Sequence, residues 1–209
     1  MQPRAPLGKQ LLSLISLAAT LLLLACTPTP KLEPVPHGGT IIAFGDSLTA
    51  GVGTAPAKSY PSVLAQLSNR RVVNAGVSGE TTSQGLGRLS TVLNDNAADL
   101  LILIEGGNDI LRNQNLTQTK RNLAQMIELA QNQRLSVVLV GVPEKKLFSK
   151  TAPLYKELAE EYGLVFEGEI IGDLIRQSKY KSDSVHFNSE GYRVMAEEIY
   201  ELLEGHGAL

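Results

Sequence analysis

The chain has 209 residues, and its 19 basic and 21 acidic side chains give a formal net charge of −2. Nothing in this balance suggests binding to nucleic acid, so we expect no nucleic-acid partner. Cys26 is the only cysteine, which excludes an intrachain disulfide. The roughly 170 residues from Thr40 onward are enough for one domain with a substantial core.

The first 25 residues have the pattern of a signal peptide. Arg4 and Lys9 precede an apolar run, Leu11–Leu24, which is too short for a comfortable membrane span but suits a signal-peptide core. The run leads into Leu23-Leu24-Ala25-Cys26, which resembles the lipobox of bacterial lipoproteins, where the cysteine is diacylated and becomes the new amino terminus. We therefore predict a lipoprotein signal peptide over residues 1–25 and lipidation of Cys26. An ordinary secretory signal or an uncleaved anchor is the alternative.

Residues 26–39 are predicted to form a lipidated, proline-rich linker. Four prolines between Thr27 and Gly39 favour an extended, semi-rigid spacer. Thr27 is not an aspartate, so by resemblance to enterobacterial lipoproteins there is no inner-membrane retention signal. We therefore expect a monomeric domain in the bacterial cell envelope, held on a short stalk by a lipid anchor at Cys26. The expected membrane is the outer membrane, with the domain facing the periplasm.

From Thr40 onward, short apolar runs alternate with segments of helical periodicity. The expected strands are Thr40–Phe44, Arg71–Asn74, Leu100–Ile104, Val137–Gly141 and Leu164–Phe166. The expected helices are Tyr60–Leu67, Gly85–Leu93, Lys120–Asn132, Leu154–Tyr162 and Ser189–Leu203, the last capped by Ser189. This alternation predicts one α/β domain over residues 40–205, a three-layer α/β/α doubly wound sheet of about five parallel strands.

A candidate nucleophile and its base stand on loops of this predicted sheet. Ser47 follows the first strand, at the sheet edge where right-handed crossovers gather the strand-to-helix loops. A histidine suits the task of taking the serine proton, and only His186 lies within the predicted domain, because His37 falls in the spacer and His206 in the Gly-rich tail. Asp183 can fix the tautomer of His186. Each residue alone also fits a turn, a cap or a surface position.

Two further loop residues can donate hydrogen bonds to a developing oxyanion. Gly79 offers a backbone N–H in a loop that can approach a substrate closely. Asn108, which follows two glycines, offers its side-chain amide. Singly they are ordinary turn or cap residues. Together with Ser47 and His186 on one edge, they predict acyl-transfer chemistry.

These motifs occur in the order of a known family. Gly45-Asp46-Ser47-Leu48, Gly79, Gly106-Gly107-Asn108-Asp109 and Asp183-Ser184-Val185-His186 resemble the four sequence blocks of the SGNH (GDSL) hydrolases. Within that family the chain is most similar to the bacterial arylesterase, thioesterase I and lysophospholipase branch, through residues 73–82 and 85–89.

The resemblance implies a flavodoxin-like fold and a role for each block. Ser47 would be the nucleophile, His186 the base and Asp183 its orienting acid. The backbone N–H groups of Ser47 and Gly79 and the Asn108 amide would form the oxyanion hole. Behind them, Asp46 and Asp109 would hold these loops. The resemblance implies neither a metal nor an organic cofactor.

The residues 142–148 depart from the pattern of this branch, where a longer loop with an asparagine and an aromatic residue helps line the acyl pocket. Acyl-chain preference is therefore not carried over. Pro143 from this segment, with Ile110 and Leu111 after the third block, are the candidates for the substrate pocket.

We predict a serine esterase that cleaves small carboxylic esters or thioesters through an acyl-enzyme intermediate. A carbohydrate O-acetylesterase acting on envelope polysaccharide is the alternative that the same machinery could serve, and a pocket restricted to acetyl groups would favour it. A non-catalytic envelope lipoprotein is the third possibility, and the intact set of Ser47, Asp183 and His186 argues against it.

Overall fold

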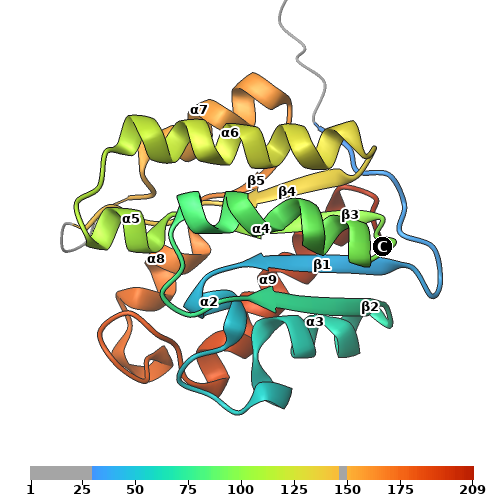
Figure 1. The fold of residues 1–209 in the computed structure, drawn as a ribbon. Helices are drawn as coiled ribbons and strands as arrows, with labels where there is room; N and C mark the ends of the chain where they lie inside the picture. Colours follow the sequence, from blue (N-terminus) through green and yellow to red (C-terminus); the bar gives the residue numbers. More distant parts are fainter. Residues whose placement is uncertain (1–29, 146–149) are drawn as a thin grey trace, which may run out of the picture.

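In the computed structural model, residues 30–145 and 150–209 are described. They form a five-stranded parallel sheet in the order β2-β1-β3-β4-β5, with helices on both faces (Figure 1). The strands are β1 (Thr40–Gly45), β2 (Arg71–Gly76), β3 (Leu100–Ile104), β4 (Ser136–Val140) and β5 (Val165–Glu167). The predicted doubly wound α/β fold is confirmed, and each expected strand is present within two residues of its bounds.

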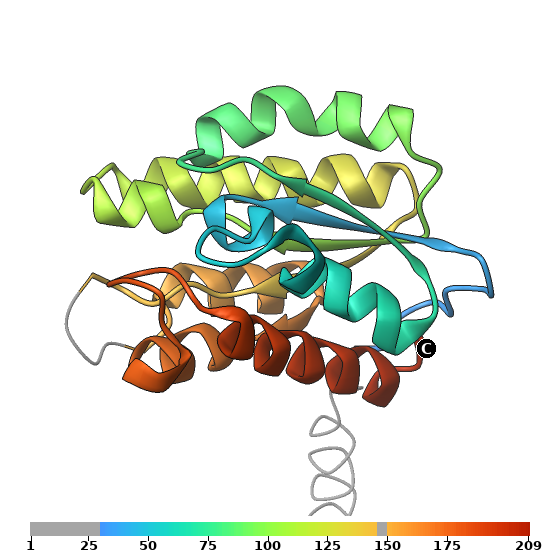
Figure 2. The same ribbon diagram turned by 90° about the horizontal axis from the view of Figure 1, so that it is seen from below.

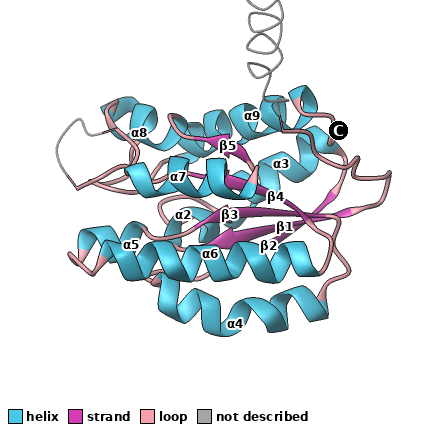
Figure 3. Cartoon of the chain, turned by 90° about the horizontal axis from the view of Figure 1, so that it is seen from above, coloured by secondary structure: helices cyan, strands magenta, loops and turns pink. Residues whose placement is uncertain are grey.

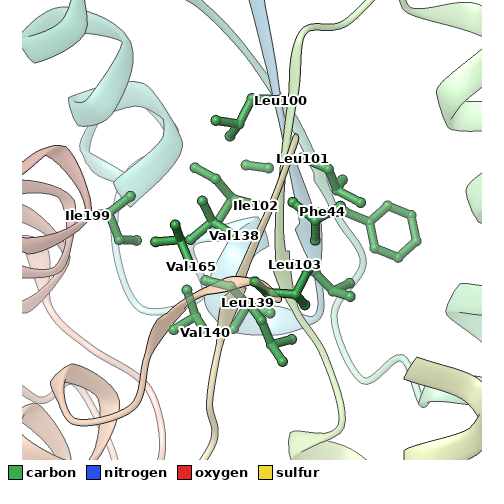
Figure 4. Close-up of a cluster of buried hydrophobic side chains, with 14 of the residues drawn as sticks. Phe44, Leu100, Leu101, Ile102, Leu103, Val138, Leu139, Val140, Val165 and Ile199 are labelled. Atoms are coloured by element: carbon green, nitrogen blue, oxygen red, sulfur yellow. The ribbon is translucent and has the colours of Figure 1, made fainter. Parts of the chain in front are cut away.

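The core forms around the two central strands. Every residue of β1 and β3 is buried, and their register sets Ile42 beside Leu101. Figure 4 shows Phe44, the side chains of β3 and β4, and Ile199 from the last helix packed together across the sheet. A strand covered on both faces has no polar side to present, which explains why residues 100–104 are apolar throughout.

Two layers of helices cover the sheet (Figure 3). One layer holds α4 (Thr82–Asp95), α6 (Leu116–Asn132) and α7 (Pro153–Tyr162). The other holds α3 (Tyr60–Ser68) and α9 (Ser189–Gly205), which pack against each other (Figure 2). The predicted cap of the last helix is wrong by one residue: Asn188 accepts the N–H groups of Glu190 and Gly191, and Ser189 is the first helical residue.

Three short helices were not predicted from the sequence, and all three stand at the carboxyl edge of the sheet. They are α2 (Ser47–Ala50), α5 (Gly107–Leu111) and α8 (Ile170–Ile175). Two 3₁₀ turns, Pro56–Lys58 and Ser178–Tyr180, complete the described elements. Helices this short give little periodic signal, because a single turn shows no repeat.

The segment 30–39, expected to belong to a spacer, lies against the domain. Leu32 and Val35 are buried in the core, and their N–H groups donate to the carbonyl oxygens of His206 and Ala208 at 3.0 and 2.8 Å. His206 Nδ1 in turn lies 2.7 Å from the carbonyl oxygen of Pro30. Residues outside the expected bounds of 40 and 205 therefore pack on the domain at both ends, and Ala208 is fully buried as well.

Two of the predicted regions, the signal peptide over 1–25 and the lipidated Cys26, lie outside the described residues. Within residues 30–145 and 150–209, no helix is both long enough and apolar enough to cross a membrane.

Candidate active site

Ser47 stands where β1 passes into α2 at the carboxyl edge of the sheet. Gly45 ends β1 so close to β3 that an added β-carbon would lie 2.2 Å from the carbonyl oxygen of Ile104, so only glycine fits there. The next residue, Asp46, caps the helix by accepting the N–H of Leu48 at 3.0 Å. Ser47 is then the first helical residue, half-buried and facing a cavity.

The structure joins Ser47 to the two residues predicted to act with it. Ser47 Oγ lies 3.0 Å from His186 Nε2, and His186 Nδ1 lies 2.7 Å from Asp183 Oδ2. A carboxylate can only accept hydrogen bonds, so Nδ1 carries a proton and a neutral imidazole leaves Nε2 as an acceptor for the serine hydroxyl. The three side chains therefore form one hydrogen-bonded line.

The turn that carries Asp183 keeps its carboxyl group ionised. Its Oδ1 accepts the N–H groups of Val185 and His186, both at 2.9 Å. These bonds, the one from Val185 foremost, together with the His186 ring, lower the pKa of Asp183 to about 2. The Asp183 side chain is half-exposed while that of His186 is only 19 % exposed, so the acid holds the ring from its solvent side.

Gly79 lies on the loop after β2 and lines the same cavity as Ser47. Its φ of +79° is a backbone conformation that side chains other than glycine rarely adopt. Its carbonyl oxygen accepts a hydrogen bond from Arg112 Nη2 at 3.0 Å. That bond fixes the orientation of the loop next to Ser47.

Asn108, near the start of α5, links the loops that follow three neighbouring strands. Its Nδ2 donates to the carbonyl oxygen of Glu80 at 2.9 Å and to Asp46 Oδ2 at 3.2 Å. Asp109 beside it accepts the N–H and hydroxyl of Thr82 at 2.9 and 2.6 Å, which fastens the start of α4. Both carboxyl groups are buried: Asp46 reaches the wall of the cavity beside Ser47, whereas Asp109 is not among the residues that line it.

An ion pair and a buried acid behind these loops were not assigned any role from the sequence. Arg88 binds Glu80 with contacts of 2.5 and 2.7 Å, and also donates to the carbonyl oxygen of Ala75 at 2.8 Å. Glu105 immediately follows the apolar strand β3 and is fully buried. Its Oε2 accepts the N–H of Gly106 at 3.1 Å.

Burial raises the pKa of two acids behind the site, Asp46 and Glu105. Burial raises the pKa of Asp46 to about 6, partly opposed by the N–H of Leu48. Burial, reinforced by the negative charge of Asp46, raises the pKa of Glu105 to about 10, so Glu105 is a neutral acid at pH 7. No group of three or more His, Cys, Asp or Glu side chains within residues 30–145 and 150–209 is arranged to hold a metal ion.

A cavity of about 600 Å³ opens beside Ser47 and His186. Gly79 and Asn108 line it, and so do the three residues predicted for the substrate pocket, Ile110, Leu111 and Pro143. One wall of the cavity was not predicted from the sequence: α8 supplies it through Ile171, Gly172 and Ile175. The one signal for that wall is the apolar spacing of residues 170, 171, 174 and 175, which is typical of one helix face.

Residues 43–194 match the GDSL-like lipase/acylhydrolase family. The chain belongs to this family. It is 32% identical to "Esterase TesA" of Pseudomonas aeruginosa over 69% of this chain and 74% of that protein, and 30% identical to "Arylesterase" of Vibrio mimicus over 79% and 88%. The psychrotrophic esterase EstA from Pseudoalteromonas sp. has the same fold, with a TM-score of 0.73 and 21% identity over 80% of this chain and 97% of that one.

The matched region contains every block of the candidate site, from the strand before Ser47 to the helix after His186. The family and the esterase relatives identify the chain as an ester hydrolase.

Proposed function

We propose that the chain hydrolyses small carboxylic esters or thioesters with Ser47 as nucleophile, His186 as general base and Asp183 as the acid that orients His186. The observation that carries this proposal is the line of hydrogen bonds from Ser47 Oγ through both ring nitrogens of His186 to Asp183. A serine hydroxyl becomes a competent nucleophile when a neutral imidazole accepts its proton.

In the proposed first step, Ser47 Oγ attacks the carbonyl carbon while its proton passes to His186 Nε2. The bond between the carbonyl carbon and the leaving oxygen or sulfur then breaks, and His186 returns the proton to that leaving group. Water repeats the sequence on the acyl-Ser47 ester and releases the acid. The lowered pKa of Asp183 supports this role, because a carboxylate beside Nδ1 stabilises the imidazolium formed in each step.

The proposed oxyanion hole consists of the N–H groups of Ser47 and Gly79 and the amide of Asn108. In support, all three residues line one cavity, and Arg112 holds the carbonyl oxygen of Gly79 and with it the loop that carries the Gly79 N–H. The two Asn108 N–H groups are directed at Glu80 and Asp46. An oxyanion would share one of these donors, and negative charge on Asp46 strengthens the other bond by charge assistance.

The size and lining of the cavity favour an acyl group longer than acetyl. A volume of about 600 Å³ lies within the range of sites for small organic ligands. Its walls are largely apolar, with Ile110, Val142, Ile171 and Ile175 among them. This observation supports the esterase proposal over the alternative of a carbohydrate O-acetylesterase, for which a small polar pocket would suffice.

The test is hydrolysis of p-nitrophenyl esters from acetate to decanoate by the full chain in detergent, beside Ser47→Ala. We expect rates that depend on Ser47, with a loss in kcat of roughly 10³-fold or more in the variant. The rate should rise from acetate to medium chains and then level off. Activity confined to acetate would favour the O-acetylesterase, and equal rates for a folded wild type and Ser47→Ala would refute the proposal.

We also propose that Cys26 carries the lipid anchor and that the monomeric enzyme faces the periplasm from the outer membrane. The apolar run Leu11–Leu24 followed by Ala25-Cys26 supports the anchor, and Thr27 supports the outer membrane. Two or three acyl chains on one cysteine would give stable attachment, where a single chain is marginal. Metabolic labelling with a palmitate analogue, lost in Cys26→Ser, is the direct check.

A further inference from the structure

The chain enters the domain at the end opposite the candidate active site. Pro30 and Leu32 bond to His206, the cap at the carboxyl end of α9. The other end of α9 lies at the site, because its first residue, Ser189, follows His186 by three residues. The 17 residues of α9 span about 25 Å. Figure 1 shows the same separation: the start of the described chain lies by the C-terminus, and α2, α5 and α8 lie at the far end.

The entry point is fixed on the domain by several independent contacts. Leu32 and Val35 are buried, and their N–H groups bond to the tail after α9. Arg70 Nε also donates to the carbonyl oxygen of Val35 at 3.0 Å, and the N–H of Glu33 donates to Ser136 Oγ at 3.2 Å. The connection between the domain and Cys26 therefore begins at Pro30, not at Thr40 where β1 starts.

Only four residue steps separate Cys26 from Pro30, a reach of at most about 14 Å in a fully extended chain. A domain turned with its active-site mouth against the bilayer would hold Pro30 about 25 Å above it, the length of α9. The connection is too short for that orientation. The mouth therefore cannot face the bilayer directly.

We infer that the anchored enzyme acts on esters that reach it from the aqueous phase and not on acyl lipids embedded in the membrane that holds it. The inference rests on the proposed function, that is, on Ser47 as nucleophile and Cys26 as lipid anchor. The inferred substrate is an ester that is soluble enough to diffuse to the site and has an acyl group short enough for the cavity beside Ser47.

The test measures how fast Ser47 reacts with a probe that is bound to lipids of the membrane that anchors the enzyme. The full lipidated chain is reconstituted in phosphatidylethanolamine–phosphatidylglycerol vesicles that contain a fluorophosphonate coupled to a lipid headgroup. The phosphonate bonds to an activated serine oxygen with loss of fluoride. One probe has a linker of a few atoms, and the other has a polyethylene glycol linker long enough to cross the domain. We expect the short probe to label Ser47 at least about tenfold more slowly than the long one, because a linker that cannot span two sites gives almost no effective concentration.

A matched pair of variants tests the cause. Leu32→Ser with Val35→Ser removes the buried contacts and frees the chain back to Gly39, which lengthens the reach to about 45 Å. This variant should become labelled by the short probe. Lys31→Ser with Pro34→Ser changes exposed positions of the same segment and should behave as the wild type.

The possible outcomes distinguish failure of this inference from failure of the serine-esterase proposal or of the lipid-anchor proposal. Equal labelling of the wild type by both probes would overturn the orientation while leaving the esterase intact. If a soluble fluorophosphonate does not label Ser47, the serine-esterase proposal fails and the inference falls with it. If the chain does not float with vesicles, the anchor fails and the inference falls for that separate reason.

Discussion

Replacing Glu105 by glutamine should make the protein more stable, and the gain should grow with pH. Glu105 is fully buried at the end of β3, with Oε2 on the N–H of Gly106. Its Oε1 makes no hydrogen bond within the described residues. A glutamine can keep the contact to Gly106 through its oxygen and turn its NH₂ group toward the neighbouring Glu80 carboxylate.

The expected difference in unfolding free energy between Glu105→Gln and the wild type follows from proton linkage. Burial raises the pKa of Glu105 in the folded protein to about 10, whereas an unfolded glutamate titrates near 4.3. Between these values the folded state holds one proton more than the unfolded state, so rising pH destabilises the wild type by about 1.4 kcal/mol per pH unit. The contribution is absent below about pH 4 and grows by roughly 4 kcal/mol from pH 5 to pH 8. Glutamine does not titrate and escapes this loss.

The assay is urea unfolding of wild type and Glu105→Gln at pH 5, 6, 7 and 8, with the free energy of unfolding taken from the midpoint and slope. We expect the stability difference to widen steadily with pH and the slope to stay constant. Glu160→Gln, on the exposed face of α7, is the control and should give a constant small difference. A difference between wild type and Glu105→Gln that does not change with pH would refute the reasoning, because Glu105 would then be ionised in the folded state.

Three further substitutions test the site. Asn108→Ala should lower kcat by about 10²–10³-fold, the range for one oxyanion donor, and a wild-type kcat would remove its amide from the mechanism. Arg88→Met should cost about 3 kcal/mol of unfolding free energy by leaving the buried Glu80 carboxylate unpaired, whereas Arg193→Met, in an exposed pair on α9, should cost less than about 1. Ile175→Trp should reduce kcat/KM for long acyl esters by about fourfold per excluded methylene and spare acetate, and a uniform loss would argue against α8 as the pocket wall.

The strands and the order of the site motifs could be predicted because their signals are local. The apolar run at Leu100–Ile104 specifies a strand covered on both faces, and its bounds are those observed. Helix starts were less accurate, since α6 begins at Leu116 where Asn115 accepts two N–H groups, four residues before the expected start. The polar first turn of α6 carries no apolar periodicity, so the cap residue was the only available signal.

The missed features depend on contacts between distant parts of the chain. The sequence predicts Glu105 to be a loop residue. Its burial becomes visible only when the neighbouring strands and loops that cover it are in place. The sequence places His206 in a Gly-rich tail, yet its Nδ1 forms a hydrogen bond with the carbonyl oxygen of Pro30, 176 residues away. Leu32 and Val35 are two isolated apolar residues among prolines, a pattern that is indistinguishable from a solvated linker until the tail after α9 supplies their partners.

The segment 30–36 therefore has to be tested as part of the domain. Leu32 is 8 % exposed, so Leu32→Ala removes about three buried methylene equivalents and should cost about 2 kcal/mol of unfolding free energy. This is the low end for buried leucines, because a segment at the edge of the domain can relax into the space. Activity on a soluble ester should stay within about twofold of wild type, since the contact lies at the far end of α9 from Ser47. Pro34→Ala, exposed in the same segment, is the control. A Leu32→Ala protein as stable as the wild type would mean that the segment is not packed in solution. Cys26 would then hold the domain on a connection long enough to turn its active site toward the membrane.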